Sequence, residues 1–181
     1  MLLHVGNHYQ VKGHDALLRM FSSLRAVDAT LVIIGGPPRG GRSCWETCQR
    51  AAARDGRVRL LSGLCRREVV AAYREADVVL LTSRFEVAPL TLVEAMAAGV
   101  PFVSYNVGNA TELAGGLVVN TAEEMARILR DLLEDHDRRR RLGEEGRQAH
   151  RHMFEWERII DRYEEFYSRV WATARSSRGI R

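Results

Sequence analysis

The sequence predicts an α/β fold: a Rossmann-like, doubly wound parallel sheet of six strands, with helices on both faces and a C-terminal helical extension. Short apolar runs and helical patterns alternate six times along the 181 residues, which is typical of such a sheet. The hydrophobic content of 46% is enough for one sizeable core. No apolar run reaches the roughly 18 residues that a membrane-spanning helix needs.

The expected strands are short runs of apolar and β-branched residues, and each ends at a glycine or a polar turn. In chain order they cover residues 2–6, 30–34, 58–61, 77–81, 101–105 and 116–119. The expected helices cover residues 14–24, 43–54, 66–75, 90–98, 121 onward, 137–153 and 156–171. This alternation predicts that the strands run parallel and that helices connect them.

Apolar spacing and capping signals place the helices. Leu17, Leu18, Phe21 and Leu24 recur at helical intervals in the first of them. Residues 121–124 have the S/T-x-x-E spacing of a capping box, which begins the fifth helix. The apolar face of that helix contains Met125, Ile128, Leu129, Leu132 and Leu133. The last helix has an unusually aromatic stripe, formed by Ile159, Ile160, Tyr163, Phe166, Tyr167, Val170 and Trp171.

Charge and cysteine content limit the partners and the compartment. The net charge of +4 comes entirely from residues 137–181, where 12 basic side chains face 8 acidic ones and where four arginines, 138–141, are consecutive. A solvated helix face is favoured over a contact with nucleic acid, and a peripheral contact with acidic lipid at the inner membrane surface is left open. Three cysteines, a sparse and odd number, indicate a reducing cytoplasm. The first residues lack the basic flank and long apolar core of a signal peptide.

Two carboxylates bracket the turn between the fourth strand and its helix. Glu86 and Glu94 are eight positions apart, at an edge where parallel sheets bind ligands and where helix N-termini offer N–H groups to anions. Thr91 and Glu94 match a capping box, which gives Glu94 a structural explanation. Glu86 has no local partner at capping distance, and a carboxylate suits adjacent sugar hydroxyls. Spacing alone leaves both interpretations open.

The first turn, residues 6–13, also follows a strand and precedes a helix. Gly6 would let a ligand approach the backbone, and Lys12 places a point charge near the helix start. Lys12 is the only lysine among 27 basic residues, which is a hint of a specific need, although chance explains it equally well. The turn is neither a Walker loop nor a G-x-G-x-x-G fingerprint, so an NAD site is not expected.

Other catalytic or metal-binding patterns are not recognisable in the sequence. The six histidines have no metal-ligand spacing, and Cys44 and Cys48 share a helix face without a second pair. These thiols are interpreted as inert rather than as zinc ligands. There is no G-x-S-x-G elbow and no nucleophile with a base at a fixed offset. We therefore expect no metal at the site.

Four motifs occur in a fixed order along the chain. They are Val5-Gly6 with Lys12-Gly13; Ala76-Asp77-Val78 with Ser83-Arg84-Phe85-Glu86; the E-x7-E pair continuing through residues 95–101; and Phe154-Glu155-Trp156. Together they resemble the C-terminal, donor-binding half of the GT-B-fold retaining glycosyltransferases of family 4, or glycosyl transferases group 1. The resemblance covers Val5 to about Val170 and implies one half of a GT-B fold.

The resemblance implies a role for each residue of the two turns. Glu86 would contact the hydroxyls of the donor sugar, Glu94 would hold the ribose, and Lys12 would neutralise the diphosphate as the glycosyl bond breaks. Backbone amides near residues 88–91 would bind the phosphates, without a metal or another cofactor. The implied site consists of Gly6, Asn7, Lys12, Arg84, Glu86, Ala88, Leu90, Thr91 and Glu94, with Lys12 and Glu86 as the catalytic residues.

Two departures from the family pattern affect this site. The family usually has an arginine where Asn7 stands, so one phosphate-neutralising charge is missing, and Arg84 is the residue that could compensate. The glycine-rich segment after the first glutamate is Val87-Ala88-Pro89 here, which removes one N–H and narrows the sugar pocket. The donor sugar and its base therefore stay open.

The resemblance also divides the chain and defines its function. Residues 1–153 would be the nucleotide-sugar-binding domain, 154–175 a closing helix that crosses to an N-terminal acceptor domain, and 176–181 a disordered tail. The expected activity is sugar transfer with retained configuration, weak or absent in this half alone. The alternatives are a non-catalytic nucleotide-sugar-binding module that needs a partner chain and, ranked lower, a nucleotide-sugar epimerase. A purely structural protein is disfavoured by the placement of Glu86 and Lys12.

Overall fold

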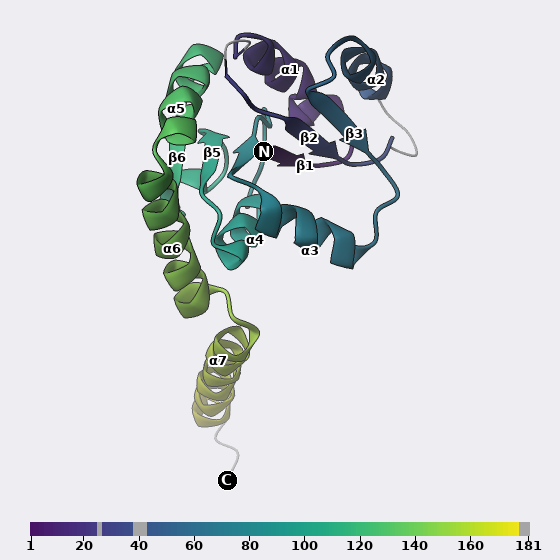
Figure 1. Cartoon of the computed structure of the whole chain (residues 1–181). Helices are drawn as coiled ribbons and strands as arrows, with labels where there is room; N and C mark the ends of the chain where they lie inside the picture. Colours follow the sequence, from purple (N-terminus) through teal and green to yellow (C-terminus); the bar gives the residue numbers. More distant parts are fainter. Residues whose placement is uncertain (25–26, 38–42, 178–181) are drawn as a thin grey trace.

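A single parallel sheet forms the centre of the molecule (Figure 1). The computed structural model describes residues 1–24, 27–37 and 43–177. The strands are β1 (Leu2–Val5), β2 (Leu31–Ile34), β3 (Val58–Leu61), β4 (Val78–Leu81), β5 (Phe102–Tyr105) and β6 (Gly116–Val119). Their order is β3-β2-β1-β4-β5-β6, and every pair is parallel. The predicted fold class is therefore confirmed, with the strand order of a classical dinucleotide-type sheet.

Helices cover both faces of this sheet and continue beyond it. They are α1 (His14–Ser22), α2 (Trp45–Arg54), α3 (Arg66–Glu75), α4 (Leu90–Ala98), α5 (Ala122–Glu134), α6 (His136–Met153) and α7 (Trp156–Ser177). Two short 3-10 helices, η1 (Gln10–Lys12) and η2 (Ala110–Glu112), were not predicted, because single turns leave no periodic apolar pattern. No helix in the described ranges is both long enough and apolar enough to cross a membrane.

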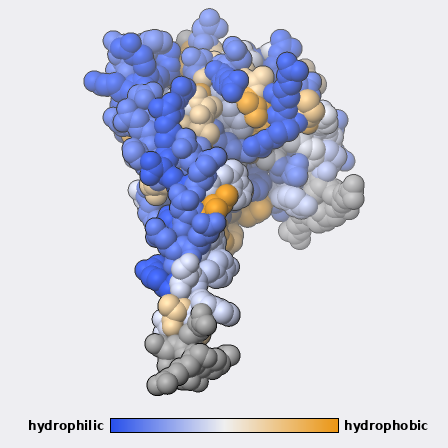
Figure 2. Space-filling view, turned by 90° about the horizontal axis from the view of Figure 1, so that it is seen from below, coloured by the Kyte–Doolittle hydropathy of each residue, from blue (hydrophilic) through white to orange (hydrophobic). Residues whose placement is uncertain are grey.

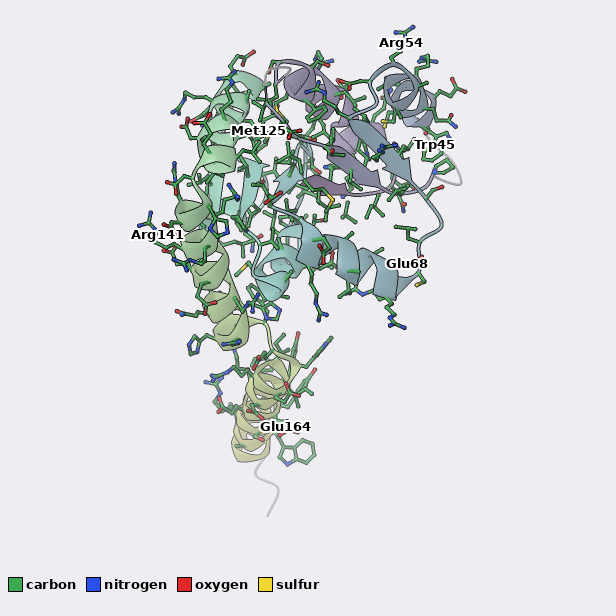
Figure 3. The ribbon with its side chains drawn as sticks, viewed as in Figure 1. Trp45, Arg54, Glu68, Met125, Arg141 and Glu164 are labelled. Atoms are coloured by element: carbon green, nitrogen blue, oxygen red, sulfur yellow. The ribbon has the colours of Figure 1, made fainter. Side chains whose placement is uncertain are left out.

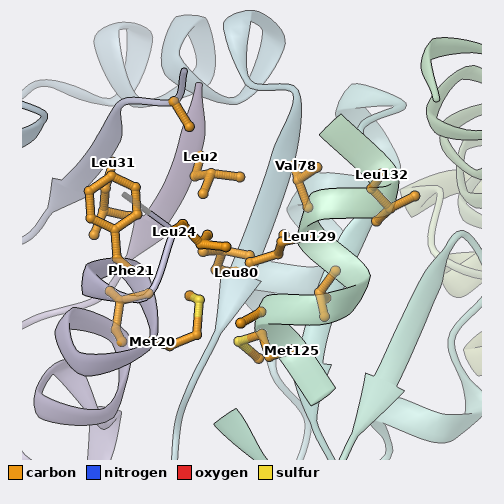
Figure 4. Packing of buried hydrophobic residues seen from close by; sticks show 14 of the residues in the cluster. Leu2, Met20, Phe21, Leu24, Leu31, Val78, Leu80, Met125, Leu129 and Leu132 are labelled. Atoms are coloured by element: carbon orange, nitrogen blue, oxygen red, sulfur yellow. The ribbon is translucent and has the colours of Figure 1, made fainter. Parts of the chain in front are cut away.

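The core has two layers because successive strand residues point to opposite faces of the sheet. Leu2 and Leu80 lie in the cluster that α1 and α5 cover, whereas Leu3 and Leu81 lie in the cluster that α3 and α4 cover. Figure 4 shows the first cluster, where Met20 and Phe21 of α1 and Met125, Leu129 and Leu132 of α5 pack next to each other against the same face of the sheet. The runs that predicted the strands are continuous rather than alternating for this reason.

Helix α6 packs closely against α4 through its glycines. A side-chain carbon at Gly143 would lie 2.1 Å from the carbonyl oxygen of Gly99, so only glycine permits this approach. The Arg147 guanidinium donates a hydrogen bond of 2.8 Å to the Ala98 carbonyl at the end of α4. These contacts fix the C-terminal end of α4, the helix that follows β4.

One of the four consecutive arginines is part of the fold rather than a free surface charge. Arg139 donates to the carbonyls of Leu132 and Leu133 at the end of α5, the latter at 2.7 Å, and lies 3.6 Å from Asp77. Its side chain is 14% exposed. The predicted solvated face therefore holds fewer than four arginines, and it offers correspondingly less charge to an anionic surface.

Helix α7 projects from the rest of the domain, and most of its side chains face solvent (Figure 1). It extends to Ser177, so the first two residues of the expected disordered tail are helical, and residues 178–181 lie outside the described part. Its exposed apolar side chains are Trp156, Ile160, Tyr163, Phe166, Tyr167, Val170 and Trp171. Elsewhere the view in Figure 2 is largely hydrophilic, with small hydrophobic areas.

Candidate functional site

The carboxyl ends of β1 and β4 lie at the point where the strand order reverses. From β1 the chain continues toward β2 and β3, and from β4 it continues toward β5 and β6. Open α/β sheets bind ligands outside the carboxyl ends of the strands at such a point. In Figure 3, Trp45 and Glu68 mark the first turns of α2 and α3, which cover opposite faces of the sheet.

The turn after β1 is fixed by backbone contacts to the end of β4. Gly13 has φ +69°, and a side-chain carbon there would lie 1.9 Å from the Thr82 carbonyl oxygen. The Thr82 hydroxyl donates to the Gly13 carbonyl at 3.1 Å, and the Arg84 N–H donates to the Val11 carbonyl at 2.8 Å. These contacts set the position of Lys12 relative to the loop after β4.

The two residues predicted to be catalytic meet at the carboxyl ends of these strands. Lys12 Nζ donates to Glu86 Oε1 at 2.7 Å, and the side chains are 29% and 15% exposed. Ser83 Oγ donates to the same oxygen at 2.7 Å. Glu86 thus has a local partner three residues earlier, contrary to the expectation that it has none. Among the described residues, none donates to its second oxygen, Oε2, which stays available to a ligand.

The loop that carries Glu86 is supported from the next strand. Gly108, in the turn after β5, has φ +53°, and a side-chain carbon there would lie 2.4 Å from the Val87 carbonyl oxygen. Side chains of this loop face outward instead: Phe85 is 68% exposed, Val87 76% and Leu90 71%. The loop therefore has a fixed backbone and an apolar outer rim.

Glu94 lies on α4 and joins it to α3. Tyr73 Oη donates to Glu94 Oε2 at 2.7 Å, and Arg66 Nη1 donates to Oε1 at 2.7 Å. Burial raises the pKa of Tyr73, and the carboxylate raises it further, so the hydroxyl keeps its proton and donates. The capping-box interpretation of Thr91 and Glu94 is wrong, because α4 begins one residue before Thr91 and Glu94 bonds to another helix. Neither partner of Glu94 could be recognised from local spacing, because Arg66 and Tyr73 lie on another helix.

The start of α4 has no protein cap. Pro89 is the N-cap residue and makes no side-chain bond, and the first turn contains no acidic residue. The N–H groups of Leu90 and Thr91 have no intrahelical acceptor, as is usual in a first turn. Thr91 Oγ1 lies 3.5 Å from the Val5 carbonyl oxygen, which places this helix start beside the end of β1. The uncapped N–H groups and the helix dipole favour an anion.

The side chains of Arg84 and Asn7 bind partners other than Lys12 and Glu86. Arg84 Nη2 lies 2.8 Å from Asp15 Oδ2, and Arg19 bonds the same oxygen at 3.0 Å. Burial acts to raise the pKa of Asp15, but the bond with Arg19 and the charge of Arg84 lower it overall. Asn7 Oδ1 accepts from the N–H of Gly36 at 3.2 Å, which connects the turns after β1 and β2. Arg84 therefore does not supply the charge that Asn7 lacks.

A buried histidine cluster lies beneath the Lys12 turn. His4, His8 and His14 have no exposed surface, the His8 and His14 rings stack with centroids 4.2 Å apart, and the His4 ring meets His14 edge-on at 4.7 Å. Burial lowers the pKa of His4 to about 4 and that of His14 to about 3, and it also lowers the pKa of His8. Sequence spacing did not predict this cluster, because it depends on how the strand end, the turn and α1 pack together.

Comparisons with known proteins agree with this geometry. The family model described as glycosyl transferases group 1 matches residues 1–149. The chain belongs to this family. It is 34% identical over 176 residues to a D-inositol 3-phosphate glycosyltransferase of Corynebacterium aurimucosum, covering 91% of this chain and 42% of that one. It therefore spans less than half of that relative.

Solved structures show the same fold. Anabaena HepE, solved in complex with UDP-glucose, is 21% identical with a TM-score of 0.82, over 92% of this chain and 48% of that one. The C-terminal domain of a glycosyl transferase group 1 protein, LpcC of Francisella tularensis, is 18% identical with a TM-score of 0.74, over 86% of each chain. The group 1 domain described here is thus similar to a C-terminal GT-B domain, as its motifs predicted.

Proposed function

We propose that this chain is the donor-binding domain of a glycosyltransferase that moves a sugar from a nucleoside diphosphate to an acceptor with retained configuration. The observation that carries the proposal is the Lys12–Glu86 pair beside the uncapped start of α4. A cation, a carboxylate with one free oxygen and unpaired amides are the groups that a diphosphate joined to a sugar requires. Family membership and the UDP-glucose bound to HepE support the same assignment.

The diphosphate would lie between Lys12 and the first turn of α4. As the bond from the sugar to the diphosphate breaks, its electrons stay on the leaving oxygen, and the Lys12 ammonium and the amides of Leu90 and Thr91 stabilise that charge. These groups act without a metal ion. Gly6 fits this placement: a side-chain carbon there would meet His4 and Lys12 only at ordinary contact distances, so the protein itself leaves room for one.

The two glutamates would divide the rest of the donor. Glu86 would accept hydrogen bonds from sugar hydroxyls through its free oxygen, while Ser83 and Lys12 hold the other. Glu94 would bind the ribose diol, with Arg66 and Tyr73 fixing its orientation. Arg66 is 74% exposed and can move aside, whereas Tyr73 is 3% exposed and cannot. We therefore add Tyr73 to the predicted site as a positioning residue for Glu94.

The acceptor would bind to a second domain, present in the longer relatives, across the same sheet edge. The aromatic face of α7 and the exposed Phe85, Val87 and Leu90 are apolar surfaces of the kind that such a domain covers. Without it we expect donor binding and little or no transfer. A cytoplasmic location fits a donor of this class and the free cysteines of the described residues.

Thermal unfolding with nucleotides tests the donor site. In EDTA, we expect UDP, GDP or ADP, or a sugar conjugate of one of them, to raise the melting temperature, since a ligand at 100 times its Kd stabilises by about 2.7 kcal/mol. Glu94→Ala should remove the shift, and Glu75→Ala, an exposed acid at the far end of α3, should keep it. The absence of a shift with all of these compounds would refute the donor-site proposal. Transfer assays with a separate acceptor domain then distinguish an enzyme half from a binding module.

A further inference from the structure

Three metal-binding side chains from separate parts of the chain meet beneath the Lys12 turn. His8 lies in the loop after β1, His14 is the first residue of α1, and Cys44 directly precedes α2. Each offers one ligand atom, and these atoms all lie within 4.8 Å of one another. Cys44 Sγ is 3.6 Å from His8 Nδ1. His8 and His14 are fully buried, and Cys44 is partly buried.

We propose that His8, His14 and Cys44 bind a divalent cation of the Zn²⁺ class. One thiolate and two imidazoles are borderline-soft ligands, and this combination favours Zn²⁺ over Mg²⁺ or Ca²⁺, which prefer oxygen. The site is separate from the proposed donor site and does not depend on that function. Its role would be to hold the turn that carries Lys12.

Unpartnered nitrogens provide the main argument for a ligand. His8 Nε2 and both nitrogens of His14 are buried and form no hydrogen bond of regular geometry with the described residues. A polar atom left unpaired in the interior lowers the stability of the fold. An imidazole with two unpaired nitrogens is unusual in a folded core. A bound cation would satisfy one nitrogen of His14; on His8 it would take Nδ1, the nitrogen near Cys44 Sγ, and leave Nε2 as it is.

The distances fit a site that closes around a cation by ring rotation. At Zn–S and Zn–N lengths of about 2.3 and 2.0 Å, tetrahedral ligand atoms are about 3.3–3.6 Å apart, close to the measured 3.6 Å between Cys44 Sγ and His8 Nδ1. The stacked His8 and His14 rings are inclined by 23° and would have to turn further so that both face one ion. In this rotation the His14 ring would give up only a weak contact with the Gly6 backbone.

Cys48 could supply a fourth ligand, although it is not part of the group of three. Cys48 is fully buried one helical turn after Cys44. With Cys48 the set would be two cysteines and two histidines, which is a common closed structural zinc site. Sequence spacing suggested that the two cysteines lack a second pair. In the fold, His8 and His14 take that place.

The alternative of a catalytic cysteine is less consistent with the surroundings. A nucleophilic cysteine needs a lowered pKa, but burial raises the pKa of Cys44, and it raises that of Cys48 to about 12. A coordinated cation displaces the thiol proton directly, so this burial is compatible with a ligand role. Backbone contacts already hold the site together, since the Cys44 N–H donates to the His8 carbonyl at 3.1 Å.

Cobalt substitution tests the site directly. The full chain is stripped with a chelator under reducing conditions and titrated with Co²⁺. We expect one equivalent to bind, with the visible bands of tetrahedral Co²⁺ and a thiolate charge-transfer band, and Zn²⁺ to displace it. Cys44→Ser should remove the charge-transfer band or shift it strongly, and His14→Gln should weaken binding at least tenfold. Cys65→Ser, which removes an exposed thiol elsewhere, should change neither.

A second measurement covers the case in which a variant fails to fold. Cys44 and Cys65 of the unaltered chain are alkylated with and without one equivalent of Zn²⁺ and quantified by mass spectrometry. Protection of Cys44 but not of Cys65 supports the site. Absence of stoichiometric binding, or binding that leaves Cys44 as reactive as before, overturns it. Because the cation would hold the Lys12 turn, nucleotide shifts are compared in EDTA and with one equivalent of Zn²⁺. A shift in either condition supports the donor site whatever the cobalt titration shows, so the two proposals can fail separately.

Discussion

Replacing Glu86 with glutamine separates the two functions proposed for this carboxylate. Glu86→Gln keeps the side-chain shape, and its amide oxygen can still accept from Ser83 and Lys12. It removes the negative charge that lies 2.7 Å from Lys12 Nζ and that competes with a diphosphate for this ammonium. It also replaces a charged acceptor for sugar hydroxyls with a neutral one. The loss of competition for Lys12 strengthens binding of both ligands, because both carry the diphosphate. The weaker acceptor for sugar hydroxyls lowers the affinity for the sugar conjugate alone.

The expected magnitudes follow from the exposure of the pair. A partly exposed ion pair is worth about 1 kcal/mol, so its release should tighten binding of a nucleoside diphosphate about fivefold. Hydrogen bonds from hydroxyls to a charged oxygen contribute about 1.5–3 kcal/mol, and that contribution is weakened for the sugar conjugate. A neutral acceptor still contributes about 0.5–1.5 kcal/mol, so the preference for the sugar conjugate over the free diphosphate should fall about 5- to 10-fold.

Isothermal titration with a nucleoside diphosphate and its sugar conjugate measures both constants. The decisive quantity is the ratio of the two Kd values in the original chain and in Glu86→Gln. Glu75→Gln is the matched control, because it removes an exposed carboxylate at the C-terminal end of α3, away from the carboxyl ends of the strands. An unchanged ratio would show that Glu86 does not contact the sugar. Weaker binding of the free diphosphate in Glu86→Gln would show that Glu86 does not compete for Lys12.

Three further outcomes are expected. Tyr73→Phe removes the hydroxyl that holds the α4 carboxylate and should lower the free energy of unfolding in urea by about 1 kcal/mol while weakening nucleotide binding; unchanged binding would contradict the positioning role. Gly13→Ala should destabilise by more than about 2 kcal/mol, because of its φ of +69° and a carbonyl 1.9 Å away, whereas Gly56→Ala, with nothing within 4 Å, should stay within about 0.5 kcal/mol. In EDTA, the unfolded chain takes up protons at His4 and His14 below pH 6.5, but the folded protein, with pKa values of about 4 and 3, does not. Stability present above pH 6.5 is thus lost on acidification, by about 2 kcal/mol per ring at pH 5, and equal urea midpoints at pH 7.5 and 5 would refute this.

The order of elements was predictable because each strand is a short apolar run with a glycine or polar turn behind it. The juxtaposition of Lys12 and Glu86 followed from one topological rule, that the carboxyl ends of parallel strands share an edge. What could not be predicted depends on side-chain direction between elements distant in sequence. Tyr73 reaches Glu94 from another helix, and Arg84 turns to Asp15 rather than to the Lys12–Glu86 pair.

The histidine cluster shows the same limit more clearly. His8, His14 and Cys44 are separated by irregular intervals, and no local spacing connects them. Their meeting depends on how the strand end, α1 and the segment before α2 pack in three dimensions. Metal motifs are recognisable in sequence when their ligands come in close pairs, and here only Cys44 and Cys48 do.

The backbone contacts made by glycines around the Lys12–Glu86 pair affect how a preference for a particular donor could change. The turns after β1, β2 and β5 touch neighbouring loops backbone to backbone, at Gly13, Gly35 and Gly108. A frame assembled in this way has no side chains that could repack to accommodate a different ligand. The side chains beside this frame that can change without disturbing it are Phe85 and Val87, which are 68% and 76% exposed. New donors could be accommodated by substitutions at these two positions while the frame, and with it the placement of the charged pair, stays unchanged.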